Sequence, residues 1–153
     1  MKKIIAVIIS VLLCAMLSSC QLVKRNPSGG SSDSGVFTVY IGDDGATVYS
    51  VDIKDVEVTE GALSVLNYLK DNNDLNLEYT VGAYGAFITE LGSLKPEGSS
   101  YIAVYTTCET DYSLPPYDTT KSVNGVTFTY SGVGVSEMTV SGGISVLFVV
   151  ETY

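Results

Sequence analysis

Downstream of its N-terminal apolar run, this 153-residue chain repeats apolar residues at helical spacing in one stretch only. Ala62, Leu66 and Leu69 are separated by four and three positions, which places them on one face of a helix. The polar run Asp71–Asp74 follows and predicts the end of the helix. A helix of about three turns is not stable alone and must pack against other elements. The sequence therefore predicts a domain of strands with one packed helix.

Segments rich in β-branched and aromatic residues surround the predicted helix. Val36–Ile41 and Ala46–Val58 flank the turn residues Gly42–Gly45, which predicts a hairpin. Gly42 and Gly45 suit such a turn because glycine adopts backbone conformations that other residues avoid. The other predicted strands are Gly85–Leu91, Tyr101–Thr107, Gly125–Tyr130 and a closing hairpin formed by Ser136–Val140 and Ile144–Val150.

The first twenty residues have the order of an export signal. Two lysines precede an apolar run from Ile4 to Met16, which is shorter than the ~20 residues that cross a bilayer. Small residues follow, as at a signal cleavage site. Leu17–Cys20 (LSSC) resembles the lipobox of bacterial lipoproteins, and the resemblance implies removal of residues 1–19 and attachment of lipid to the thiol of Cys20. The alternative is an ordinary secreted protein with an incidental cysteine.

Residues 20–35 are expected to form a lipidated, flexible tether. Asn26–Gly35 consist almost entirely of Gly, Ser and other polar residues, which cannot bury apolar surface. Domain 36–153 would then lie at the extracytoplasmic face of the cell membrane, anchored through Cys20. Cys108 would be the remaining free thiol, so no intramolecular disulfide is expected. A lone cysteine can be reactive, but it is more often a small buried side chain.

The charge of the chain argues against several partners and chemistries. After removal of the signal, six basic residues face seventeen acidic ones, a balance that repels nucleic acid. The chain has no histidine, which removes the usual catalytic base and zinc ligand. Asp43 with Asp44 and Glu109 with Asp111 form carboxylate pairs, but both pairs fall in a predicted turn or loop. We therefore expect no enzymatic activity and no cofactor.

A calcium loop is considered because Asp71 and Asn73 suit the first and third positions of an EF-hand. Leu75 then occupies the fifth position and Gly82 the place of the bidentate glutamate, and neither side chain can bind the ion. The run is better explained as the polar turn after the helix, so no metal site is expected.

The order of motifs resembles the transcobalamin C-terminal-like family of bacterial extracellular domains, a domain of unknown function. The similar segments are the helix Ala62–Leu69, the glycine-rich strand Gly82–Leu91, the aromatic strand Tyr101–Tyr105, the Asn-Gly turn Val123–Val126 and the closing element Gly134–Gly143. The resemblance spans Val36 to Tyr153. It implies an α+β fold, a mostly antiparallel β-sheet with one packed helix and a β-grasp-like character.

The same resemblance implies a ligand. In transcobalamin the similar domain covers one face of a corrinoid that is bound by a large helical domain. This chain lacks that helical domain, and it has no tryptophan where many relatives carry one in the aromatic strand. A corrinoid is therefore an expectation from the resemblance alone.

Tyrosine supplies the candidate binding residues, since the chain has eleven tyrosines and no tryptophan. Tyr101 and Tyr105 are four positions apart in a predicted strand and so share one face. Polar residues and the Pro115-Pro116 pair predict a surface loop over Cys108–Ser122, which holds two more tyrosines. Aromatic rings offer a large contact area, so the candidate ligand-binding residues are Tyr84, Phe87, Tyr101, Tyr105, Tyr112 and Tyr117. The alternative is that these rings only cover a half-exposed sheet.

Two functions remain open at this point. The first is a surface-tethered, non-catalytic binding module for a corrinoid or another small ligand. The second is a structural or interaction domain of a cell-surface assembly, with no small-molecule site. An absorption band acquired from cobalamin would favour the first function, and co-purification of a ligand-free chain with a cell-wall protein would favour the second.

Overall fold

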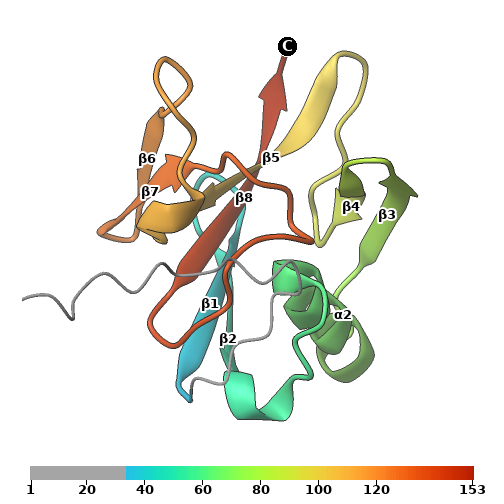
Figure 1. Cartoon of the computed structure of the whole chain (residues 1–153). Helices are drawn as coiled ribbons and strands as arrows, with labels where there is room; N and C mark the ends of the chain where they lie inside the picture. Colours follow the sequence, from blue (N-terminus) through green and yellow to red (C-terminus); the bar gives the residue numbers. More distant parts are fainter. Residues whose placement is uncertain (1–33) are drawn as a thin grey trace, which may run out of the picture.

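The computed structural model describes residues 34–153. The expected signal peptide, Cys20 and the tether as far as Asp33 lie outside the described residues. Two 3-10 turns, Ile53–Asp55 and Glu109–Asp111, accompany one α-helix and eight strands. In chain order these are β1 (Val36–Ile41), β2 (Thr47–Asp52), α2 (Gly61–Asn73), β3 (Leu77–Gly82), β4 (Gly85–Leu91), β5 (Ser100–Thr106), β6 (Thr120–Val123), β7 (Val126–Tyr130) and β8 (Ser145–Thr152) (Figure 1).

The strands form two sheets. Six of them lie in the order β2-β1-β8-β5-β7-β6, and β3 pairs with β4 in a separate two-stranded sheet. β1 runs parallel to β8, with Thr38 opposite Ser145, whereas β5 runs antiparallel to β8, with Tyr101 opposite Glu151. Figure 1 shows α2, β3 and β4 on one side of the central strands and the β6–β7 hairpin on the other.

The expected α+β, mostly antiparallel and β-grasp-like fold is wrong. Strands hold 43% of the described residues and helix 16%, and the large sheet is mixed. The predicted hairpin of Ser136–Val140 with Ile144–Val150 does not form, because residues 136–140 lie outside any strand. Met138 and Val140 bury their side chains in the core cluster that includes α2. Without an adjacent hairpin partner, β8 lies between β1 and β5 and is parallel to β1.

The predicted helix is confirmed, with a longer extent than the apolar repeat suggested. α2 buries Leu63, Leu66 and Leu69 against the large sheet. It begins at Gly61, whose backbone has φ +50° and where a Cβ would lie 2.7 Å from the carbonyl oxygen of Met138. Only glycine allows both this conformation and this approach. The irregular segment before β8 is therefore packed directly against the first turn of the helix.

A second core cluster lies on the opposite face of the sheet. β8 contributes to both clusters, with Phe148 facing α2 and Leu147 and Val149 facing the β6–β7 hairpin. This double burial explains the continuous apolar run of β8. The sheet curls so far that the Asn124 side chain donates to the carbonyl of Gly45 at 3.1 Å. The last hairpin of the sheet thereby contacts the turn of its first hairpin.

Candidate functional site

A groove of about 420 Å³ lies between β4 and β5. Four aromatic side chains line it, namely Phe87, Tyr101, Tyr130 and Tyr153. Aliphatic residues of β4, β5 and the segment after β7 complete its walls: Ile88, Ile102, Val104, Val133 and Val135. Among residues 34–153, none of those that line the groove is charged.

The groove exists because β5 has a partner along only part of one edge. β7 lies opposite Tyr105 and Thr106 alone, and the backbone N–H of Ser131 extends this contact by donating to the carbonyl of Val104 at 2.9 Å. The first half of β5 has no strand on that side in the described chain. β4 belongs to the other sheet and approaches this open half without pairing to it.

Tyr101 and Tyr153 form the rim of the groove. Their rings stack with centroids 5.0 Å apart and an interplanar angle of 20°. The Tyr101 hydroxyl lies 3.4 Å from a carboxylate oxygen of Glu151. Interaction of this hydroxyl with Tyr130, followed by burial and the charge of Glu151, holds the pKa of Tyr101 above its usual range. The phenol thus stays neutral and can offer both a ring and a hydroxyl to a ligand.

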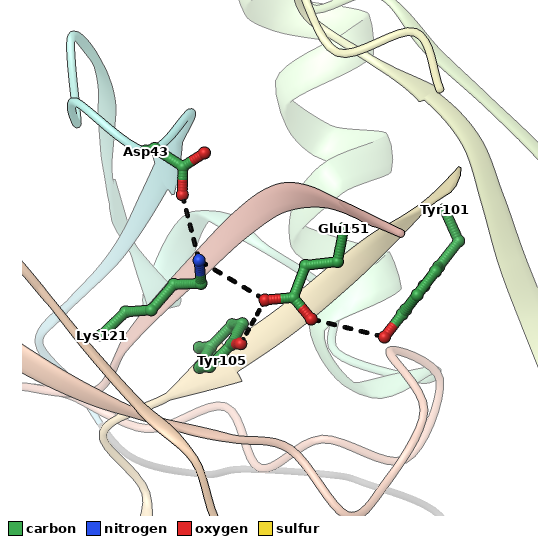
Figure 2. Close-up of polar contacts among 5 residues, drawn as sticks. All are labelled: Asp43, Tyr101, Tyr105, Lys121 and Glu151. Atoms are coloured by element: carbon green, nitrogen blue, oxygen red, sulfur yellow. Dashed lines mark hydrogen bonds and ion pairs between the residues drawn. The ribbon is translucent and has the colours of Figure 1, made fainter. Parts of the chain in front are cut away.

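Tyr105 lies behind Tyr101 in the curled sheet, where it is buried to 2% exposure. Its hydroxyl donates to the second carboxylate oxygen of Glu151 at 2.5 Å, and its ring meets that of Tyr130 edge-on at 5.2 Å. Burial, with the Glu151 hydrogen bond, raises the pKa of Tyr105 to about 12. One carboxylate therefore holds both tyrosines of β5, as Figure 2 shows.

Lys121 of β6 completes this polar network. Its Nζ lies 3.3 Å from Asp43, in the β1–β2 turn, and 3.4 Å from Glu151 on β8 (Figure 2). Burial favours the neutral amine, but the two carboxylates outweigh it and raise the pKa of Lys121. The ion pairs connect three separate segments and fix the curl of the sheet. Because its ammonium group is paired with two carboxylates of the protein, we do not expect Lys121 to bind a ligand.

Tyr105 should make the fold sensitive to alkali. The unfolded phenol loses its proton near pH 10, whereas the folded one retains it to about pH 12. The stabilisation is therefore complete below about pH 10 and is lost as the pH rises towards 12. In urea unfolding we expect the free energy of unfolding to fall by about 1 kcal/mol between about pH 10 and 11. Tyr105→Phe should show a shallower fall, and an equal slope in both proteins would contradict this assignment.

The structure places the six predicted aromatic residues in different environments. Phe87 and Tyr101 line the groove together, whereas Tyr105 is buried behind it. Tyr84 is 97% exposed at the tip of the β3–β4 hairpin and does not line the groove. In the predicted loop, Tyr112 is half-buried and its hydroxyl donates to the carbonyl of Thr107 at 3.3 Å, while Tyr117 is exposed.

Two aromatic residues of the groove were not among the predicted candidates. Tyr153 follows the last strand by one residue, and its position opposite Ser99 places it beside Tyr101. Tyr130 ends β7 and reaches the groove because the sheet curls. Their only sequence signal was residue type, since their neighbours in space come from distant segments.

The described residues contain neither a candidate metal cluster nor a membrane-spanning helix. Across residues 34–153, Cys, Asp and Glu nowhere form a group of three that could hold a metal ion. Cys108 is a half-buried free thiol whose Sγ lies 3.1 Å from the hydroxyl of Thr110. Within the same range, no helix has the length and apolar character needed to cross a bilayer.

Comparison with known proteins gives little further identification. No protein-family model matches the chain, and no curated protein matches it. Among solved structures, the chain is similar to a protein from Ruminococcus gnavus described as a "putative metal binding protein". The TM-score is 0.49, with 15% identity over 78% of this chain and 98% of that chain. Similarity at this level identifies neither a family nor a ligand, and the resemblance to the transcobalamin C-terminal-like family stays a prediction.

Proposed function

We propose that this chain is a non-catalytic binding module held at the cell surface by lipid on Cys20, and that its ligand lies in the β4–β5 groove. One observation carries the proposal: Phe87 is 51% exposed and Tyr153 is 83% exposed, although both rings border a hollow. Binding sites for small molecules are typically apolar clefts of about 300–1,000 Å³ with few polar groups. The volume of about 420 Å³ and the aromatic lining are within that description.

The small ligand favoured by the sequence resemblance is a corrinoid. A flat macrocycle would gain apolar burial against Phe87 and stacking near the Tyr101–Tyr153 pair. The hydroxyls of these tyrosines could stay hydrated or bind amide side chains of the ligand. A groove of this size would cover one edge of a corrinoid and leave the rest exposed.

Phe87→Ala tests the groove as the binding site. The full chain is titrated with hydroxocobalamin, and binding is followed by the absorption of the corrin ring. Loss of a half-exposed aromatic ring from the contact should weaken binding by about tenfold or more, since about 1.4 kcal/mol corresponds to a factor of ten. Circular dichroism of the variant should remain that of the parent.

Tyr117→Ala is the matched control. Tyr117 is 70% exposed but lies in the loop before β6 and does not line the groove. Its removal should leave the affinity unchanged. If Tyr117→Ala weakens binding and Phe87→Ala does not, the ligand lies elsewhere. If the unsubstituted chain does not bind hydroxocobalamin, the corrinoid is excluded as the ligand.

The second candidate is an interaction domain of a cell-surface assembly. It is favoured by the open first half of β5, because an unpaired strand edge is a template for another polypeptide. This candidate uses the same groove and needs no small molecule.

Anchoring depends on Cys20 in this proposal. Cys20→Ala should accumulate as an uncleaved or unlipidated chain, because Cys14 and Cys108 do not stand at the end of the LSSC motif, where the lipid would be attached. Metabolic labelling with a fatty-acid analogue and partition into detergent measure the outcome. A processed and acylated Cys20→Ala chain would show that the lipobox assignment is wrong.

A further inference from the structure

We infer that the β4–β5 groove takes an extended polypeptide segment carrying Lys or Arg residues, which pairs with the open edge of β5. This inference rests on the proposed function, in which the same groove is the binding site, and it names the chemical class of the ligand.

The open edge is defined by the register of β5. In a strand, the backbone groups of successive residues point to opposite neighbours, so those of residues two apart point to the same neighbour. The carbonyl of Val104 accepts from Ser131 on the β7 side, and the backbone groups of Ile102 therefore point to that side too. The N–H of Thr107, just after β5, donates to the carbonyl of Ser145, the first residue of β8, on the opposite side, as the alternation requires. Among the described residues, none pairs with the N–H or the carbonyl of Ile102.

The groove leaves this edge accessible. Ile102 lines the groove together with Ala86 and Ile88 of β4. The N–H of Ala86 is occupied, because it donates to the hydroxyl of Ser136 at 3.1 Å. The backbone N–H and carbonyl groups that remain available to an incoming segment are therefore those of β5. Pairing of an extended segment with a strand edge supplies main-chain hydrogen bonds, and neighbouring pockets receive its alternate side chains.

The charges around the groove specify basic residues in the segment. Glu97 precedes β5, and Glu137 follows the Ser136 that contacts β4. Glu151 at the rim is paired with Lys121 at 3.4 Å, and Lys95 is paired with Glu90 at 2.8 Å. Residues 34–153 hold sixteen acidic residues against four basic ones, so the domain that bears the groove is strongly negative. Lys or Arg residues flanking the paired stretch would be attracted to it.

The test starts from short random peptides displayed on phage and selected on the full chain. The tightest peptide is synthesised, together with variants N-methylated at one residue at a time. N-methylation removes a backbone donor and leaves every side chain in place. We expect methylation at one residue, or at residues two apart, to weaken binding by about tenfold. Methylation at intervening residues should have little effect, and the selected peptides should be basic and bind less tightly at high salt.

The outcomes separate this inference from the proposed function. Peptides that bind but tolerate N-methylation at every position overturn the pairing with β5. A selection that yields no binding peptide overturns it as well, whereas loss of hydroxocobalamin binding in Phe87→Ala would still support the groove. Peptides that bind Phe87→Ala as tightly as the parent overturn the groove itself. N-methyl sensitivity together with loss of binding in Phe87→Ala supports both.

Discussion

Phe128→Ala is expected to lower the free energy of unfolding by about 3–5 kcal/mol. Phe128 lies on β7, is fully buried and packs in the cluster between the sheet and the β6–β7 hairpin. Its ring meets that of Tyr40 edge-on at 5.3 Å. Truncation removes these contacts and leaves a cavity that the surrounding strands, fixed by their hydrogen bonds, can fill only in part. Urea unfolding followed by circular dichroism measures the effect.

Phe87→Ala is the matched control for this substitution. It removes the same side chain from a position that is 51% exposed, so the free energy of unfolding should change by about 1 kcal/mol at most. The pair therefore separates a structural phenylalanine from one that borders the groove. Equal losses of stability would show that Phe87 belongs to the core and that the groove is not an open site.

Leu66→Ala should cost about 2–5 kcal/mol through lost burial and a residual cavity. Leu66 is fully buried on the face of α2 that packs against the sheet. Leu114→Ala provides the control, because Leu114 is 80% exposed in the loop before β6. Its truncation should leave the unfolding midpoint almost unchanged. The same midpoint for both variants would mean that α2 does not hold the position described.

Local sequence patterns predicted the elements that carry a regular pattern of apolar residues. The apolar repeat Ala62–Leu69 predicted the helix, and the β-branched segment Val36–Ile41 predicted β1 with the same bounds. Ser64 lies within the same repeat, between two apolar residues. Its hydroxyl accepts from the N–H groups of Thr59 and Glu60 at 3.1 and 2.9 Å, which stabilises the segment that leads into the helix. This interaction depends on the chain path before α2.

The arrangement of the strands could not be predicted in the same way. Alternation in Ser136–Val140 suits a strand equally well as an irregular segment whose Met138 and Val140 pack on a helix. If residues 136–140 formed a strand, β8 would be the second strand of a hairpin. Because these residues are irregular and pack on α2, β8 instead pairs with β1 and β5. β3 was missed although Leu77, Tyr79 and Val81 alternate with polar residues or glycine, as in a strand with one buried face. Leu77 is buried in the core, and β3 pairs with β4 in a sheet of only two strands.

The candidate site was predicted only in part, for a similar reason. Tyr101 and Tyr105 share one face of β5, as their spacing indicates. The curl of the sheet then buries Tyr105 under the β6–β7 hairpin and leaves Tyr101 at a rim. Spacing within a strand gives the face but not what covers it. The open edge of β5 likewise depends on where β7 stops pairing, which is a long-range property.

Ligand contact at the β4–β5 groove is tested most directly by photocrosslinking from position 87. A benzophenone-bearing phenylalanine analogue is placed at Phe87 in one version of the full chain and at Tyr117 in another, both positions being exposed. After irradiation on the producing cells, we predict a covalent adduct from position 87 and none from position 117. An adduct from position 117 alone, or from neither position, would contradict binding in the groove.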